Sequence, residues 1–427
     1  STAQIAKLTE SQLAALTTNQ IKSFTSDQIK ALTDGQLKSL TPAQIKAVDI
    51  SALNGAQLST FTSAQVQALT QDAVANLSTS QLTAMLPEQF NALTSTQVSA
   101  LTSTQLNNLS LEQLQAIDAS DWRSVSTLNL SKLATSTLTS LTSGQISAWT
   151  STQFRALTTA QFGQLLVDQI KGLDASTIAA LTTDQAKSLT QAQLQAMSQT
   201  QIRGLSTVAM VAMTPTQLAG LLEEQINALS SAQVKALSSA QLAQMSDVQI
   251  QAMDAAAVAA INVSTLSNLT STQLSRLSSQ QLASFSSTQV KALSTDQLQG
   301  LDETQLQAFS TEAVAAMSTA IINKMATSTV KSLSTKQINA LTTDQIKALE
   351  THQVGSMLDF QLAALRTDQV AVLTTTQLSQ LASKQLTALT STQVQAMGTA
   401  ILASMPTDSL TMLLPGQLSA LTSSQVK

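Results

Sequence analysis

The sequence predicts an all-α fold, a solenoid of very short helices with one helix in each eight-residue repeat. Three observations predict it. The phrase Leu-Thr-x-x-Gln-Leu-x-x recurs through almost all of the 427 residues. The same phrase is a signal for the start of a helix. The prolines and charges also fall where a short helix accepts them.

The repeat is measured most easily by its glutamine. The register runs in steps of eight residues from Gln4 to Gln44 and again from Gln57 to Gln425. It spans 53 repeats, and Gln occupies 40 of these register positions. The single phase break lies at residues 48–53, where a repeat has lost three residues. A repeat this regular decides the fold before any other feature is considered.

Four of the eight positions belong to one local motif. Thr33 and Gln36 form a capping box, in which Thr33 accepts from the third helical amide and Gln36 accepts from the amide of Thr33. Leu32 and Leu37 have the spacing of a hydrophobic staple, which fixes how the chain enters the helix. Each repeat is therefore expected to begin a helix of about six residues, which is too short to be stable alone.

Proline and charge give independent support. Four of the five prolines occupy the first helical position, where a missing N–H is harmless, and the fifth, Pro406, occupies a cap position. The four are Pro42, Pro87, Pro215 and Pro415. Acidic residues favour the first turn, as at Asp27, and basic residues follow near the end, as at Lys30. This order complements the helix dipole.

Two other periodic structures fit less well. In one continuous helix, eight residues advance about 800°, so an apolar stripe would drift by about 80° per repeat. In a β-solenoid, the apolar spacings of five and three residues would place leucine on both faces in turn. The β-solenoid is retained as the alternative, although Ala, Leu and Gln favour helices.

The organisation predicted is one continuous solenoid over residues 1–427. No linker, charge run or shift of composition divides it, and no stretch approaches the roughly 18 apolar residues of a membrane span. Neither end has the polar capping repeat that a free solenoid usually carries. We therefore expect a window of a longer array or a subunit of an assembly.

Residues that could carry chemistry are few. The chain has one histidine, His352, and no cysteine or tyrosine, so a catalytic triad, a Cys–His pair and a zinc site are not expected. Adjacent carboxylates at Glu223 and Glu224, and at Asp302 and Glu303, occupy early helical positions where acids are expected anyway. A non-enzymatic protein with no cofactor and no metal is predicted.

Nucleic acid is not an expected partner. The formal net charge is −4, and aromatic residues make up only 2% of the chain. Neither a basic stripe nor a regular stacking platform is present. The tryptophans and most phenylalanines occupy the positions of the staple leucines, which indicates core residues.

Two irregularities interrupt the pattern. Repeats around Asp121, Asn129 and Thr137, and around Ile321 and Thr329, have lost the glutamine. Leucine also replaces the polar cap in five repeats, at Leu86, Leu166, Leu222, Leu358 and Leu414. Drift in a redundant array would explain both features. The sharper hypothesis is that the five leucines mark assembly contacts between copies of the chain.

The amino-acid motif of the repeat also resembles a known group of repeat sequences. Leu93-Thr94-Ser95-Thr96-Gln97-Val98 and Leu341-Thr342-Thr343-Asp344-Gln345-Ile346 are similar to repeats of very large secreted bacterial surface and adhesin-like proteins. The resemblance covers essentially the whole chain. It implies an extracellular or cell-surface setting, with cell-surface or matrix components as further partners.

Three functions follow in order of preference. The first is a non-enzymatic extracellular structural protein that self-assembles, as a homopolymer, into a filament, surface layer or matrix. The second is a passive adhesin stalk that carries a binding domain outside these residues. The third is binding of ice or a polymer surface by a regular threonine array, although each Thr is expected to be engaged as a helix cap.

Overall fold

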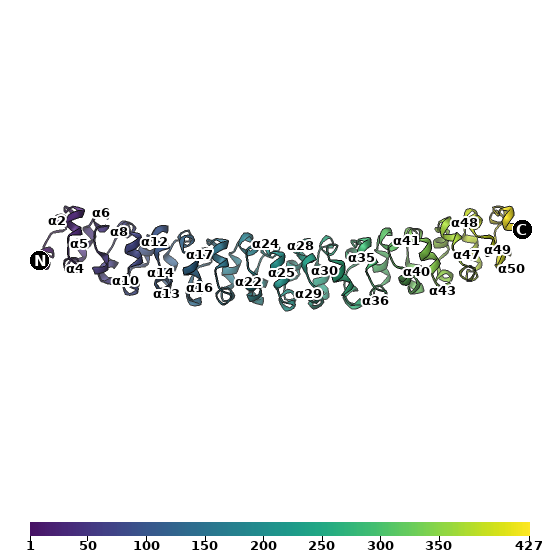
Figure 1. The fold of residues 1–427 in the computed structure, drawn as a ribbon, viewed down its shortest axis with the longest axis horizontal. Coiled ribbons are helices and arrows are strands. Elements are labelled where there is room, and N and C mark those ends of the chain that lie inside the picture. Colours follow the sequence, from purple (N-terminus) through teal and green to yellow (C-terminus); the bar gives the residue numbers. More distant parts are fainter. The chain divides into compact units, whose positions relative to one another are not determined.

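The computed structural model describes residues 1–427 and is all-α, as predicted. It contains 52 α-helices of four to six residues and two short 3₁₀-helices, with no strand. The chain divides into two compact halves, Ser1–Met213 and Thr214–Lys427. Within each half, successive helices follow one another in sequence order along the solenoid (Figure 1). None of the helices is long and apolar enough to cross a membrane.

The helices of the first half correspond one for one to the predicted repeats. Their bounds are α1 Thr2–Ile5, α2 Glu10–Ala14, α3 Thr18–Lys22, α4 Ser26–Lys30, α5 Asp34–Ser39, α6 Pro42–Ile45, η1 Ile50–Ala52, α7 Gly55–Ser59, α8 Ser63–Ala68, α9 Gln71–Ala75, α10 Thr79–Ala84, α11 Pro87–Asn91, α12 Ser95–Ala100, α13 Ser103–Asn107, α14 Leu111–Ala116, η2 Asp121–Ser124, α15 Thr127–Ser131, α16 Thr135–Ser140, α17 Ser143–Ser147, α18 Ser151–Arg155, α19 Thr159–Gly163, α20 Val167–Lys171, α21 Ala175–Ala179, α22 Thr183–Ser188, α23 Gln191–Ala196, α24 Gln199–Gly204 and α25 Thr207–Ala212.

The second half repeats the same element without interruption of the phase. Its helices are α26 Pro215–Ala219, α27 Glu223–Asn227, α28 Ser231–Ala236, α29 Ser239–Gln244, α30 Asp247–Ala252, α31 Ala255–Val258, α32 Val263–Ser267, α33 Ser271–Leu274, α34 Ser279–Ala283, α35 Ser287–Lys291, α36 Thr295–Gln299, α37 Glu303–Gln307, α38 Thr311–Ala315, α39 Thr319–Asn323, α40 Thr327–Ser332, α41 Thr335–Ala340, α42 Thr343–Ala348, α43 Thr351–Ser356, α44 Asp359–Ala363, α45 Thr367–Ala371, α46 Thr375–Leu378, α47 Ser383–Ala388, α48 Ser391–Ala396, α49 Thr399–Ala403, α50 Thr407–Thr411, α51 Pro415–Ser419 and α52 Ser423–Val426.

The capping box forms as the phrase predicts. At the start of α19, the Thr158 hydroxyl accepts from the amide of Gln161 at 3.2 Å, and Gln161 Oε1 accepts from the amide of Thr158 at 2.9 Å. Helices α6, α11, α26 and α51 each begin at a proline, and Pro406 is the N-cap of α50. The local chemistry of the repeat therefore sets where each helix begins.

The core consists of the staple side chains. Leu37, Leu58, Phe90 and Ile146, at the fourth helical position, are fully buried, and the leucines that precede each cap are nearly so. Larger aromatic residues replace some of these leucines without leaving the core. The rings of Trp122 and Trp149 lie 6.1 Å apart, which confirms that both tryptophans are core residues.

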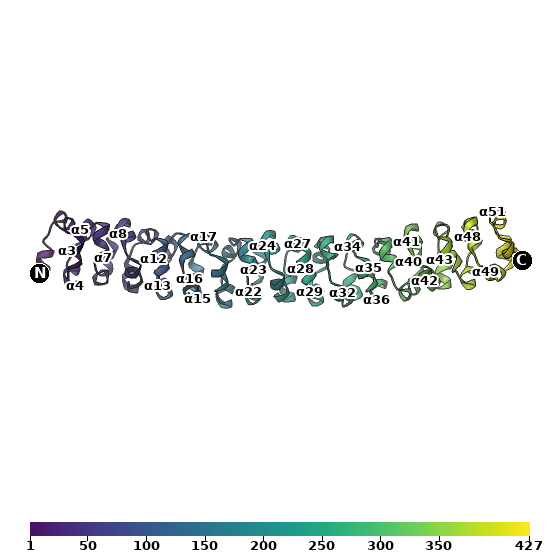
Figure 2. The ribbon, with the colours of Figure 1, turned by 45° about the horizontal axis from the view of Figure 1, so that its top comes forward.

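Each helix packs mainly on the third helix before it and the third after it. Within the first half α19 contacts α16 and α22, and within the second half α44 contacts α47 and α41. Figure 2 shows the same stacking of successive turns from another side. Small residues allow the close approach: a Cβ added to Gly55 would lie 2.4 Å from the Cβ of Ala84. One turn of the solenoid therefore takes between three and four repeats.

The register glutamine has a second role that the sequence analysis did not predict. Gln161 Nε2 donates to the carbonyls of Leu130 at 3.0 Å and Leu133 at 2.7 Å, in the preceding turn. These acceptors lie 31 and 28 residues earlier in the chain, and Gln36 and Gln417 bond carbonyls at the same two separations. Most of the register glutamines are consequently buried, and these form a ladder of amide hydrogen bonds between turns.

The phase break shows that the ladder depends on the number of repeats and not of residues. The shortened repeat folds as the 3₁₀-helix η1, capped by the Asp49 carboxylate, which accepts from the amide of Ser51 at 3.2 Å. Gln65, whose bonds span the break, donates to Leu37 and Leu40, which lie 28 and 25 residues earlier. Each separation is shorter by the three missing residues. The ladder therefore continues across the defect.

Candidate assembly surface

The five leucines in cap positions have exposed side chains. Their exposed fractions are 43% for Leu86, 50% for Leu166, 38% for Leu222, 37% for Leu358 and 49% for Leu414. By contrast, the leucines of the staple are buried. The cap leucines are therefore not part of the core, as the sequence pattern indicated.

At each of these leucines, one of the two hydrogen bonds of the capping box is lost. The amide of Leu86 still donates to Gln89 Oε1 at 2.8 Å, and the other four leucines keep the equivalent bond. A leucine side chain has no oxygen, so the amide of Gln89 bonds instead to the Leu86 carbonyl at 2.9 Å. Losing a hydroxyl cap costs about 1 kcal/mol in a typical helix. These positions thus give up local stability and expose apolar surface.

Within each half, the spacing of the leucines matches whole turns of the solenoid. Hydrogen bonds between successive turns join residues 25 to 31 apart. Gly163 lies against Ser188, 25 residues later, and Gly172 lies against Ser143, 29 residues earlier, so one turn takes about 27 residues. Leu86 and Leu166 are 80 residues apart, close to three such turns. In the second half, Leu358 lies 136 residues after Leu222 and 56 residues before Leu414, close to five and two turns. In each half, these leucines therefore return to a similar side.

Five exposed apolar side chains at the beginning of helices were missed by the sequence analysis. They occupy the first or second helical position, where the repeat is normally polar, and that departure was the available signal. They are Leu111, Leu128, Val208, Val248 and Phe360. Leu128 and Val208 belong to repeats 40 residues after those of Leu86 and Leu166, or about one and a half turns. This spacing places them on a different side.

Many of the acidic residues lie at the beginning of a helix. Asp302 is the N-cap of α37 and accepts from the amide of Gln305 at 2.8 Å, and Glu303 follows in the first turn. At α21, the amide of Thr177 donates to Asp174, and this bond lowers the pKa of the Asp174 carboxyl below its ordinary 3.8. His352 is exposed on α43. No three His, Cys, Asp or Glu side chains lie close enough together to hold a metal ion.

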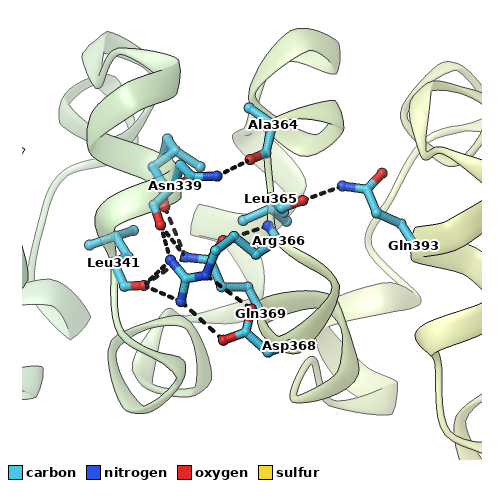
Figure 3. Close-up of polar contacts among 9 residues, drawn as sticks. Asn339, Leu341, Ala364, Leu365, Arg366, Asp368, Gln369 and Gln393 are labelled. Atoms are coloured by element: carbon cyan, nitrogen blue, oxygen red, sulfur yellow. Dashed lines mark hydrogen bonds and ion pairs between the residues drawn. The ribbon is translucent and has the colours of Figure 1, made fainter.

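Arginine takes the cap position once, and it strengthens the contact between turns (Figure 3). The guanidinium of Arg366 reaches the Leu341 carbonyl at 3.4 Å, which also accepts from Gln369 Nε2 at 2.6 Å. Asp368 pairs with Arg366 at 3.0 Å, and the hydrogen bond from Arg366 lowers the pKa of the Asp368 carboxyl. A cation at a helix start is thus balanced by an adjacent acid.

Comparison with known proteins supports a repeat array. A family model described as the ALTTAQ repeat matches residues 5–42, 74–111 and 322–359. None of the curated proteins compared with the chain matches it. Among solved structures, the "Structure of APUM23-GGAAUUGACGG" aligns over 96% of this chain and 94% of that chain, at 12% identity. Its TM-score of 0.16 is too low to carry an argument about fold or function.

Proposed function

We propose that this chain is a non-enzymatic structural protein that self-associates into an extracellular filament, surface layer or matrix. The observation that carries the proposal is the replacement of hydroxyl caps by exposed leucines at whole-turn spacings. Thr or Ser at these positions would stabilise the single chain, so contacts with other copies of the chain give a reason for leucine there. Apolar contacts that recur along one side of a solenoid favour a heterologous assembly that extends without closing.

Electron microscopy of the purified chain over a range of concentrations tests this proposal. We expect ordered filaments or sheets that disappear when Leu166 and Leu222 are both changed to Thr. Thr restores the cap hydroxyl, so the variant should fold at least as well as the natural sequence. Leu128→Thr is the matched control, because Leu128 is 62% exposed but lies on a different side. Assembly that survives the double substitution would contradict the proposed contacts.

A passive stalk is the second candidate, and the uniformity of the array favours it. A solenoid of near-identical repeats can hold a binding domain at a distance without a site of its own. This function predicts separate single molecules at every concentration. The same microscopy therefore separates the two candidates.

Surface binding by a threonine array receives no comparable support. The cap hydroxyls already have hydrogen-bond partners. That of Thr94 accepts from the amide of Gln97, the third of the helix, and donates to Gln97 Oε1 at 3.1 Å. A measurement of thermal hysteresis in solution tests this alternative, and we expect none.

A further inference from the structure

The glutamine ladder is interrupted three times in succession in the second half, at Ala313, Ile321 and Thr329. Ala313 and Ile321 are themselves buried, with exposed fractions of 0% and 3%, so their side chains occupy the interface between turns. Thr329 is only half-buried, and its repeat also lacks a polar cap because Ala326 stands there. The Thr329 repeat is therefore the weakest point of this stretch.

A cavity of about 290 Å³ lies at this position. Its apolar wall comes from Leu298, Leu301, Ile321 and Met325, and Thr329 lines it as well. This volume falls at the lower end of the range for small-molecule sites, about 300–1,000 Å³. The cavity is thus large enough for a small organic molecule and mostly apolar.

Comparison with the rest of the ladder identifies the hydrogen-bond donor that is missing at the cavity. A glutamine at position 329 would donate to the carbonyls of Leu298 and Leu301, which lie 31 and 28 residues earlier. Register glutamines on either side show the distances, 2.6 Å from Gln297 to the Leu269 carbonyl and 2.9 Å from Gln337 to the Phe309 carbonyl. Thr329 is too short to take the place of that amide. The Leu301 carbonyl is left without the donor that its counterparts have, and a buried carbonyl without a donor is costly.

The charge of the residues that line the cavity determines which hydrogen-bond donor group a ligand could place there. Lys324 lines it, and no carboxylate does. An ammonium or guanidinium ligand would meet a like charge with no compensating acid. A neutral N–H₂ group avoids this repulsion, and it reproduces the chemistry of the missing glutamine.

We propose that this cavity binds a small neutral primary carboxamide with an apolar tail. The amide N–H₂ donates to the Leu301 carbonyl, and the tail lies against Leu298, Ile321 and Met325. The site is separate from the cap leucines, so binding does not depend on assembly.

Hexanamide is a suitable probe, followed by NMR of the intact chain labelled on methionine methyl groups. We expect saturable shifts of the Met325 methyl signal. N,N-Dimethylhexanamide, which has no N–H, is expected to bind at least tenfold more weakly.

Thr329→Gln supplies the missing amide from the chain itself and should abolish the hexanamide shifts. Thr265→Gln is the matched control, because Thr265 is another half-buried threonine in the register position and does not line the cavity. Thr265→Gln should leave binding unchanged. Failure of hexanamide to saturate the Met325 signal, equal binding of the dimethyl analogue, or unchanged binding by Thr329→Gln would each overturn the proposal.

Discussion

The register glutamine uses both ends of its side-chain amide at once. In Gln161, Oε1 completes the capping box of its own helix, while Nε2 bonds two carbonyls of the preceding turn. A carboxylate could accept the capping hydrogen bond, but it has no N–H to donate to the carbonyls of the preceding turn. The preference for Gln over Glu at this position follows from the hydrogen bonds to the preceding turn.

Replacing glutamine by glutamate at two positions separates the capping hydrogen bond from the hydrogen bonds between turns. Gln161→Glu keeps the cap acceptor but removes the donor and sets a carboxylate against buried carbonyls, so we expect a loss of about 2–4 kcal/mol. Gln20 makes the same box with Thr17 but is exposed and bonds no earlier turn. Gln20→Glu is therefore expected to change stability by no more than about 0.5 kcal/mol.

Amide hydrogen exchange is the appropriate measurement, because a repeat array does not unfold in a single two-state step. Exchange should accelerate in α19 and in the segment 130–133 for Gln161→Glu. Equal effects of the two substitutions would mean that the ladder bonds contribute nothing to stability.

The cap carboxylate of Asp174 gives a prediction about pH. Its hydrogen bond from the amide of Thr177 lowers its folded pKa, so its contribution to stability is complete above the unfolded pKa and is lost as the pH falls through the folded value. NMR titration should place the carboxyl midpoint below 3.8. In Asp174→Asn, the protection of the Thr177 amide, relative to its intrinsic exchange rate, should no longer fall as the pH is lowered. A midpoint at or above 3.8 would contradict this account.

For single residues, the sequence predicted the capping hydrogen bonds within a repeat but not the hydrogen bonds of the glutamines to the preceding turn. The capping box relates residues three apart, so Thr158 and Gln161 can be paired from the sequence alone. The ladder relates residues 28 and 31 apart, and that separation depends on how many repeats make a turn. Because the box already explained each glutamine, nothing in the sequence demanded a second role.

At the scale of the element, the short helix is stable only through helices three repeats away. Phe162 in α19 is fully buried and packs between α16 and α22. Phe162→Ala should cost about 3–5 kcal/mol, with the range set by how far the site collapses.

The location of the damage tests this packing. Exchange should rise in α16 and α22 as well as in α19, and less in α18 and α20, which adjoin α19 in sequence. The control is Thr159→Ala, because Thr159 is exposed on the same helix, and it should leave all five helices unchanged. Damage that spreads mainly to α18 and α20 would contradict packing at an interval of three.

Helix positions were the most predictable feature of the fold. The start of α6 at Pro42 and that of α11 at Pro87 could be predicted because proline and the cap act over a few residues. The cavity near Thr329 could not be predicted, although the loss of Gln there was visible. Its walls come from α36, α37, α39 and α40, whose proximity depends on the number of repeats in a turn.

For the whole molecule, one complete repeat should be dispensable. Deleting residues 190–197 removes one eight-residue repeat, after which each glutamine of the later repeats still has equivalent carbonyls 31 and 28 residues before it in the shortened chain. The helical circular dichroism signal per residue should be nearly unchanged, because stability in an array is a sum over neighbours.

Deleting only residues 192–195 should be far more damaging, because it removes the register glutamine and four of the six residues of α23. We expect local exchange to rise through the adjacent turns on both sides. Equal tolerance of the two deletions would argue against a ladder that depends on whole repeats.

Every bond of the ladder runs backward along the chain, from a glutamine to carbonyls that precede it. On the ribosome, each new repeat therefore emerges after the carbonyl acceptors of its ladder glutamine have been made, although its packing is completed only by the third helix that follows. At about 5–20 residues per second, the interval between acceptor and donor is only a few seconds. The array can thus grow from its first turns as a template, adding one helix at a time in the order of synthesis.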